Sequence, residues 1–261
     1  MNTNLYSQLQ EAKAEGQNKF AVLIDPDQLR LGKLDTILQN AMDANVDYFF
    51  IGGSLIVNDM LDKVLVGIRE LCNIPQILFP GNSFQLSNKA DALLFLSLIS
   101  GRNAELLIGK HVITAPFLRK SSLEIMSTGY MLIDGGAATT VSYMSNTNPI
   151  PRDKNDIAVC TAMAGELLGL KMIYMDAGSG AQTPIPESMI SAVSNNINIP
   201  LIIGGGIKTP EKALACVQAG ADMIVVGNAI ENDPTLVAEL SHAVHSMNTT
   251  VNGFDETHPI R

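Results

Sequence analysis

The sequence predicts an α/β fold, a (β/α)₈ barrel of the TIM type, from three observations. Short apolar runs recur along the chain, and most of them end in glycine, proline, aspartate or asparagine, as buried parallel strands do. Helical stripes of apolar residues separate nearly all of these runs. The last two runs end in glycine loops, and in such barrels phosphate is often held by the loops after strands 7 and 8. A doubly wound sheet is the alternative, but eight parallel strands with two such loops last favour closure.

The first three strands are predicted from apolar runs at residues 20–24, 46–51 and 77–79. The loops that follow them begin with Asp25-Pro26-Asp27, Gly52-Gly53-Ser54 and Pro80-Gly81-Asn82. Apolar residues at helical spacing predict helices over residues 34–42 and 61–68. This part of the chain therefore follows the strand–helix rhythm of a barrel.

The rhythm falters after the third strand. Only the polar stretch at residues 83–91 precedes the fourth strand, which is predicted over residues 93–99. A crossover that includes a helix usually needs at least about ten to twelve residues. We therefore expect one helix after strand 3 to be replaced by a loop or extended segment, although a short helix is the alternative.

The second half of the chain resumes the alternation. A long polar connection at residues 137–154 is typical of a functional lid or binding loop. The predicted helices and strands are a helix over 104–118, a strand over 130–133, a helix over 157–168, a strand over 172–175, a helix over 186–193, a strand over 201–203, a helix over 210–217, a strand over 223–226 and a helix over 234–247. Residues 253–261 are expected to form a loose tail, and residues 1–261 a single barrel domain.

Composition excludes several classes of protein. The net charge of −9 argues against a nucleic-acid-binding surface. Three cysteines, Cys72, Cys160 and Cys216, are expected to be reduced core residues. The N-terminal stretch is polar, unlike a signal peptide, and the longest apolar run, at residues 92–99, is far too short to cross a membrane. We therefore expect a cytoplasmic protein without a transmembrane segment.

The tandem glycine loops carry the strongest functional signal. Ile203 is followed by three glycines, and Val226 by Gly227 and Asn228. Glycine lets the backbone approach a ligand and point several N–H groups at one phosphate. Glycines that merely turn strands into loops are the ordinary alternative, but two such loops in tandem favour a phosphate ester. The G-x-G-x-x-G spacing of a dinucleotide site is absent.

Polar side chains at other strand ends suggest chemistry, because active sites of these barrels lie at the C-terminal ends of the strands. Asp25 and Ser54 combine a carboxylate with a hydroxyl, which suits Mg²⁺ completed by water and phosphate oxygens. An Asx-type turn at Asp25 and a helix N-cap at Ser54 are equally ordinary interpretations. Tyr174 and Asp176 point to the same side of one strand and suit a polyol, with Asp176 as hydrogen-bond acceptor or base.

With these residues in view, the chain resembles the geranylgeranylglyceryl phosphate synthase family of glycerol-1-phosphate prenyltransferases. The resemblance runs from Phe20 to about Ala243. Its motifs are Leu23-Ile-Asp-Pro-Asp27, Phe50-Ile-Gly-Gly-Ser54, Leu78-Phe-Pro-Gly-Asn82, Tyr174-Met-Asp-Ala-Gly-Ser-Gly-Ala181, Ile203-Gly-Gly-Gly-Ile207 and Val226-Gly-Asn228. The family's barrels also lack one helix, which agrees with the gap after strand 3.

The resemblance implies transfer of a long prenyl chain, such as geranylgeranyl, from its diphosphate to the primary hydroxyl of sn-glycerol 1-phosphate, with Mg²⁺. Asp25 and Ser54 would hold the metal, and Asp176 and Tyr174 would be catalytic. The residues expected to bind glycerol 1-phosphate are Tyr174, Met175, Asp176, Ala177, Gly178, Ser179, Gly180, Gly205, Gly206, Gly227 and Asn228. The apolar fourth strand beside the helix gap is the expected groove for the prenyl chain of the polyprenyl diphosphate. A homo-oligomer, a dimer or a hexamer, is also expected.

Two positions depart from the family pattern: Gln28 stands where lysine is frequent, and Asp176 where glutamate is usual. The shorter carboxylate puts the contact to glycerol in question. Two other functions stay open at this point. One is a sugar-phosphate isomerase with Asp25 and Asp134 as acid and base, and the other is a non-catalytic phosphate- or prenyl-binding barrel.

Overall fold

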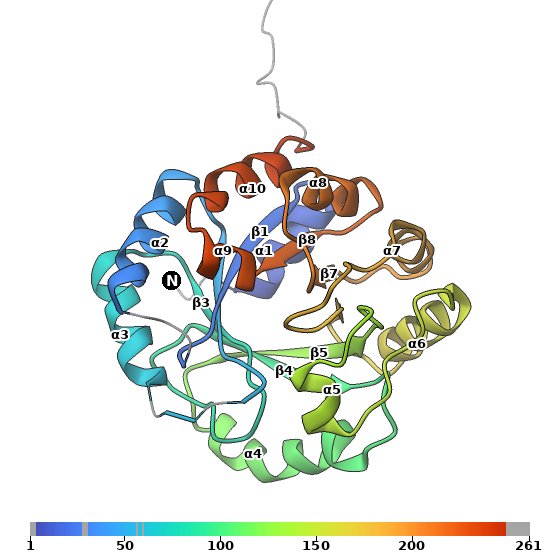
Figure 1. Cartoon of the computed structure of the whole chain (residues 1–261). Helices are drawn as coiled ribbons and strands as arrows, with labels where there is room; N and C mark the ends of the chain where they lie inside the picture. Colours follow the sequence, from blue (N-terminus) through green and yellow to red (C-terminus); the bar gives the residue numbers. More distant parts are fainter. Residues whose placement is uncertain (1–3, 28–30, 56, 59, 249–261) are drawn as a thin grey trace, which may run out of the picture.

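The strands close into a parallel barrel in sequence order, in a computed structural model that describes residues 4–27, 31–55, 57, 58 and 60–248. The strands are β1 (Lys19–Ile24), β2 (Tyr48–Ile51), β3 (Gln76–Leu78), β4 (Ala92–Leu98), β5 (Glu124–Leu132), β6 (Met172–Asp176), β7 (Leu201–Gly204) and β8 (Met223–Val226). Each strand pairs with the next, and β8 pairs with β1 (Figure 1). The predicted TIM barrel is confirmed; the single-domain organisation of residues 1–261 stays a prediction.

Side chains alternate along each strand between the barrel interior and the surrounding helices. On β6, Met172 and Tyr174 belong to the interior cluster, whereas Ile173 and Met175 pack in the outer layer with residues from the helices. Both faces of a strand are therefore buried, which accounts for the nearly continuous apolar runs in the sequence. The same alternation decides which residues at the C-terminal ends of the strands face the centre of the barrel.

Each helix predicted from the sequence has a counterpart in the described residues, and the counterparts follow in the predicted order. They are α2 (Leu31–Asp43), α3 (Leu61–Leu71), α4 (Lys110–Leu118), α6 (Asn155–Leu167), α7 (Glu187–Ser194), α8 (Pro210–Gln218) and α10 (Leu236–His245). A short π-helix, η1 (Glu105–Gly109), precedes α4. Residues 79–91 contain no helix, so α3 and α4 follow one another around the barrel in Figure 1 without a helix between them. The predicted loss of one helix is confirmed.

Three helices were not predicted from the sequence. Leu5 and Leu9 of α1 (Leu5–Ala14) pack into the interior cluster and cover the N-terminal end of the barrel. The Glu124 carboxylate accepts the N–H groups of Leu5 and Tyr6, at 2.6 and 2.9 Å, which anchors the start of α1. The other two are α5 (Thr140–Ser145), inside the long polar connection, and α9 (Asn228–Asn232). Helices of five or six residues are too short for helical periodicity to reveal them.

The remaining expectations have mixed outcomes. β5 begins at Glu124, before its predicted start at residue 130. The prediction missed the first part of the strand because polar Ser127 and Thr128 interrupt its apolar pattern. Cys72 and Cys216 are buried as expected, but Cys160 is exposed on α6. Gln28 and the expected tail lie outside the described residues. Among the residues that the structure describes, no helix has the length and apolar character needed to span a membrane.

Candidate active site

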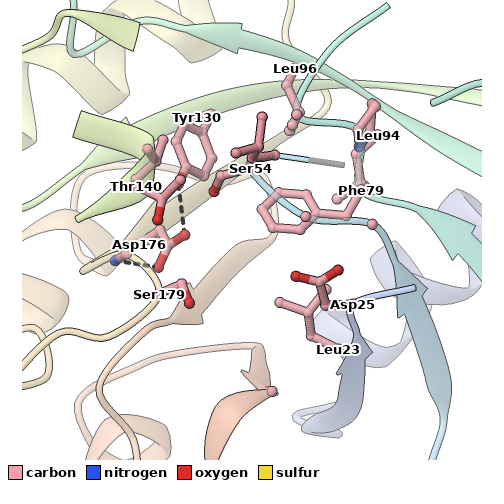
Figure 2. A pocket seen from close by; sticks show the side chains of 18 of the residues that line it. Leu23, Asp25, Ser54, Phe79, Leu94, Leu96, Tyr130, Thr140, Asp176 and Ser179 are labelled. Atoms are coloured by element: carbon pink, nitrogen blue, oxygen red, sulfur yellow. Dashed lines mark hydrogen bonds between the residues drawn. The ribbon is translucent and has the colours of Figure 1, made fainter. Parts of the chain in front are cut away.

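A cavity of about 760 Å³ lies at the C-terminal ends of the strands (Figure 2). The loops after β1, β2, β3, β6, β7 and β8 all contribute to its wall. The predicted site residues that line it are Asp25, Ser54, Tyr174, Asp176, Gly178, Ser179, Gly180, Gly205, Gly206, Gly227 and Asn228. Residues far apart in the sequence therefore meet in one cavity, which has a polar side and an apolar side.

On the β6–β8 side, the wall is made largely of backbone. Gly205 has a φ of +78°, and a Cβ there would lie 2.5 Å from Asp176 Oδ1 and 2.7 Å from the backbone nitrogens of Ala177 and Gly178. Only glycine fits such a position without a shift of its neighbours. The Ser179 hydroxyl donates to Asn228 Oδ1 at 3.1 Å, which connects the loops after β6 and β8. N–H groups in such closely packed loops suit a phosphate.

The Asp176 carboxylate ends β6 at the edge of these loops. It is 8% exposed and accepts two hydrogen bonds, from the Tyr130 hydroxyl to Oδ2 at 2.6 Å and from the Gly178 N–H to Oδ1 at 2.7 Å (Figure 2). Burial raises the pKa of the Asp176 carboxyl, while the two hydrogen bonds lower it in part. Asp176 is thus a buried acceptor that is held in place from two directions.

Aromatic rings floor the centre of the cavity. Tyr174 is 1% exposed and stacks on Phe79, with ring centroids 5.1 Å apart. Burial, and then the charge of Asp176, raise the pKa of the Tyr174 hydroxyl well above its usual value. Tyr174 therefore stays a neutral phenol, available as a hydrogen-bond donor. The Tyr174 ring packs in the interior cluster, and its side chain also lines the cavity.

On the β1–β3 side, the wall is made of polar side chains. The Asp25 carboxylate accepts the Asp27 N–H at 3.0 Å, and the Gly53 backbone lies so close that a Cβ there would be 2.8–3.1 Å from the carboxylate atoms. Glu231 of α9 also lines this side and accepts the Asp25 N–H at 3.3 Å. Figure 2 shows Asp25 across the cavity from Asp176.

Gln85, from the segment that replaces a helix, connects the β2 and β3 loops. It is 2% exposed; its Nε2 donates to the Gly53 carbonyl at 2.8 Å, and its Oε1 accepts the N–H groups of Gly81 at 3.1 Å and Gly53 at 3.4 Å. One side chain therefore fixes two loops, and through Gly53 it fixes the surroundings of Asp25. Sequence reasoning missed Gln85 because a glutamine inside a loop carries no periodic signal.

These side chains fit Mg²⁺ that arrives with a phosphate ligand. Among the described residues, no group of three or more His, Cys, Asp or Glu side chains could enclose a metal ion by itself. Mg²⁺ usually keeps several waters and takes one or two protein carboxylates together with substrate phosphate oxygens. Asp25 offers such a carboxylate and Ser54 a hydroxyl, and both line the cavity, so the donor set is compatible with the expected ion.

The other end of the cavity is apolar. It extends between β4 and α4, and its lining includes Leu93, Leu94, Phe95, Leu96, Leu98, Leu106 and Leu118. His111, whose imidazole Nε2 lies 3.3 Å from the Ser97 hydroxyl, is also in this wall. Burial lowers the pKa of His111, which favours the neutral ring. This apolar arm lies along β4, beside the missing helix, where the prenyl groove was expected.

Some predicted residues are not brought to the cavity. Met175 and Ala177 are buried in the outer layer, because alternation along β6 turns their side chains away from the interior. The Ala177 N–H donates to the Gly204 carbonyl at 3.1 Å. Asp134, the second acid of the isomerase hypothesis, does not line the cavity, and its carboxylate accepts the Gly136 N–H at 2.9 Å.

Tyr130 was missed for a different reason. It lies well inside β5, whereas the predicted strand began at residue 130, which placed Tyr130 at the end of the strand away from the site. Lys208 and Thr140 also line the cavity and were not predicted. Lys208 is separated from the three glycines by Ile207 alone, so a search for cations beside the glycine loop would have found it. Thr140 lies in α5, within the connection that was predicted to be a lid.

Comparison with known proteins agrees with this site. The sequence profile of the PcrB family matches residues 13–246. The chain is 55% identical to the geranylgeranylglyceryl phosphate synthase of Chitinophaga pinensis, with 94% of this chain and 98% of the relative covered. It is 40% identical to the enzyme of that name from Thermococcus kodakarensis, with 84% and 86% covered.

A solved structure is similar over nearly its whole length. It is the (S)-3-O-geranylgeranylglyceryl phosphate synthase of Thermoplasma acidophilum in complex with its substrate sn-glycerol-1-phosphate. The TM-score is 0.88 at 30% identity, and 94% of this chain and 99% of that chain are covered.

Proposed function

The chain belongs to the PcrB family, and we infer that it is a prenyltransferase that makes an ether lipid precursor. It moves a long prenyl chain from its diphosphate to the primary hydroxyl of sn-glycerol 1-phosphate. The observation that carries this conclusion is one continuous cavity with a glycine-loop side and an apolar arm. An isomerase would not need the apolar arm, and its second acid, Asp134, is outside the cavity wall.

Glycerol 1-phosphate binds, in this proposal, on the β6–β8 side. Its phosphate lies against Gly205, Gly206 and the loop of Gly227 and Asn228, where backbone N–H groups are available. Its hydroxyl groups face Asp176 and Tyr174. Ser179 and Gly180 complete the wall. Met175 and Ala177 were expected to bind glycerol 1-phosphate, but their side chains pack in the outer layer and do not line the cavity. We therefore give them no contact with the substrate through their side chains.

The prenyl diphosphate binds across the cavity, with its apolar chain in the arm along β4. Asp25 and Ser54 would hold Mg²⁺ in this proposal, and the bound ion would supply electrostatic stabilisation of the diphosphate leaving group. Geranylgeranyl is the proposed chain, and its length depends on the depth of the arm. Leu96, Leu106 and Leu118 form part of that arm.

The reaction exchanges one carbon–oxygen bond for another. The bond between the allylic carbon and the diphosphate oxygen breaks, and the diphosphate leaves with the electron pair. The primary hydroxyl oxygen of glycerol 1-phosphate forms the new ether bond to that carbon, and its proton passes to a base. Asp176 is the proposed base, with Tyr174 as a hydrogen-bond donor to the glycerol. Holding both substrates at fixed positions supplies much of the rate enhancement.

The assembly and the location of the protein are also proposals. The outer face of η1 and α4 exposes Ile108, Val112, Ile113 and Phe117, at 60–72%. Contiguous exposed apolar residues of this kind often mark a protein–protein interface. We propose that this face is covered in a homo-oligomer, a dimer or a hexamer. Light scattering on wild-type and Phe117→Asp protein tests this, and an unchanged mass contradicts it. The expected cytoplasmic location stays a prediction.

One assay tests the proposed activity. The protein is incubated with radiolabelled sn-glycerol 1-phosphate, Mg²⁺ and prenyl diphosphates of several lengths, and the product is extracted into organic solvent. We expect label in the organic phase only when a prenyl diphosphate is present, and most of it with the diphosphate that fits the apolar arm. A protein that binds both substrates and yields no extractable label contradicts the proposal.

A further inference from the structure

Tyr130 occupies an unusual place among the residues around the cavity. Its ring is 6% exposed and packs in the interior cluster, with ring centroids 6.0 Å from Phe79 and 5.6 Å from Tyr174. Its hydroxyl donates to Asp176 Oδ2 at 2.6 Å (Figure 2). A distance of 2.6 Å is typical of a hydroxyl that donates to a carboxylate, which is among the stronger kinds of hydrogen bond in proteins.

Asp176 is held from both sides. Its second oxygen, Oδ1, accepts the Gly178 N–H at 2.7 Å. A carboxylate offers about four lone-pair sites, two on each oxygen. Each oxygen of Asp176 therefore has one protein donor and can accept one further hydrogen bond from a ligand in the cavity.

We propose that Tyr130 is a positioning residue for glycerol 1-phosphate, acting by fixing the orientation of the Asp176 carboxylate. This inference rests on the proposed function and deepens it. The two hydrogen bonds to Asp176 come from different elements, β5 and the loop after β6, and together they fix the rotation of the carboxylate about its own axis. The remaining lone pairs are then directed at the glycerol hydroxyls before the substrate arrives, so less freedom is lost on binding.

The short side chain makes this support necessary. The terminal torsion of an aspartate is broad and roughly two-fold, so the side chain alone does not define where its oxygens point. Asp176 also lies against the glycine loop, since a Cβ at Gly205 would come within 2.5 Å of its Oδ1. The carboxylate therefore packs directly against the loop that is proposed to hold the phosphate.

Charge gives Tyr130 a second effect on the same group. Burial raises the pKa of Asp176, which disfavours its charged form, and the Tyr130 hydrogen bond opposes that shift. Burial, followed by the charge of Asp176, raises the pKa of Tyr130 itself well above its usual value. The phenol therefore remains protonated and donates throughout the physiological pH range. Loss of the Tyr130 hydrogen bond should therefore raise the pKa of Asp176 further.

The test compares two substitutions that remove the same atom. Tyr130→Phe removes the hydroxyl and keeps the ring in its aromatic surroundings. Tyr48→Phe is the matched control, because Tyr48 is 3% exposed in the same interior cluster but lies on β2 beside α1, at the opposite end of the barrel. Calorimetry with sn-glycerol 1-phosphate measures binding without turnover. We expect about ten- to a hundred-fold weaker binding for Tyr130→Phe and unchanged binding for Tyr48→Phe.

The pH profile separates positioning from packing. In Tyr130→Phe, the acid limb of kcat/KM for glycerol 1-phosphate should move to higher pH, while the KM for prenyl diphosphate stays unchanged. Equal losses for both substrates, or a limb that does not move, would mean that Tyr130 only packs the core and would overturn the proposal.

A double-mutant cycle provides the decisive measurement. If Tyr130 acts through Asp176, Tyr130→Phe should cost almost nothing more in glycerol 1-phosphate binding when it is added to Asp176→Ala. Full additivity of the two losses contradicts the inference. Wild-type protein that binds glycerol 1-phosphate but makes no ether would overturn the proposed function and leave this inference standing. Wild-type protein that fails to bind it would overturn both.

Discussion

The two sides of the cavity are built by different means. On the β6–β8 side, the wall is backbone. A Cβ at Gly205 would lie 2.7 Å from the backbone nitrogens of Ala177 and Gly178, so only glycine fits there without a shift of its neighbours. On the β1–β3 side, the crossover helix is absent after β3, and the Gln85 side chain connects the loops instead. The position of a backbone wall is fixed by the strands that carry it, whereas the position of a side-chain wall depends on individual side-chain hydrogen bonds such as those of Gln85. The two sides should therefore respond differently to substitution.

The largest effect is expected for Gly205→Ala. A Cβ at this position would displace Asp176 or the neighbouring backbone and push the phosphate off the N–H groups. Loss of two charge-assisted hydrogen bonds, at about 1.5–3 kcal/mol each, corresponds to more than about a hundred-fold weaker binding of glycerol 1-phosphate. Calorimetry with each substrate measures this, and prenyl diphosphate binding should change much less.

Gly169→Ala is the control for backbone strain. Gly169 has a φ of +84°, similar to that of Gly205, but nothing lies within 4 Å of a Cβ built there. Its substitution should cost about 1–2 kcal/mol of stability and leave both affinities unchanged. If the two alanine variants bind glycerol 1-phosphate equally well, close approach at Gly205 is unimportant.

A smaller effect, on the binding of prenyl diphosphate rather than of glycerol 1-phosphate, is expected for Asp25→Asn. The amide keeps the shape of the side chain and can still accept the Asp27 N–H, but it removes the charge that is proposed to hold Mg²⁺. Prenyl diphosphate binding in the presence of Mg²⁺ should weaken about ten- to a hundred-fold, with glycerol 1-phosphate binding unchanged. Titration with Mg²⁺ at fixed diphosphate checks this. Asp134→Asn, outside the cavity wall, should change neither affinity; an inactive Asp134→Asn with an active Asp25→Asn argues against this assignment.

Gln85→Leu tests whether side-chain bracing matters on the β1–β3 side. The substitution removes the hydrogen bonds to Gly53 and Gly81. At a net value of about 0.5–1.5 kcal/mol for a neutral hydrogen bond, we expect a KM for prenyl diphosphate about three- to ten-fold higher. The KM for glycerol 1-phosphate should not change, and steady-state kinetics with each substrate varied in turn measures both. Equal rises in the two KM values would mean that Gln85 supports the whole barrel.

The smallest effect is expected for a side-chain link on the β6–β8 side. Lys212 of α8 forms an ion pair with Glu187 of α7, and both side chains are well exposed. The hydrogen bond that Lys212 donates lowers the pKa of Glu187 in the folded protein. The ion pair therefore stabilises the fold at pH values above the unfolded pKa of Glu187, and this stabilisation is lost as the pH falls through the folded pKa. Glu187→Gln should lower stability at neutral pH by less than about 1 kcal/mol and leave glycerol 1-phosphate binding unchanged. Thermal unfolding at neutral and acid pH measures the first, and a weaker affinity would show that this side also depends on side-chain links.

The order of the eight strands and of most of the helices, the missing helix and the glycine loops were all predictable from the sequence. Each of these features depends on residues that are close together in the chain. The spacing of apolar residues predicts strands and helices, the length of one connection predicts the missing helix, and runs of glycine predict the loops. Asp25, Ser54 and Asp176 were found by the same local rule, because a polar residue that ends a barrel strand faces the cavity.

Which side chains contact these residues depends on the three-dimensional arrangement of the strands and loops. Tyr130 reaches Asp176 because the register of β5 against β6 places it beside Tyr174, one step below Asp176 on the interior face. Gln85 reaches Gly53 because the β2 and β3 loops lie together. Register and loop packing depend on contacts between residues that are distant in the chain, and no local pattern of residue types records them.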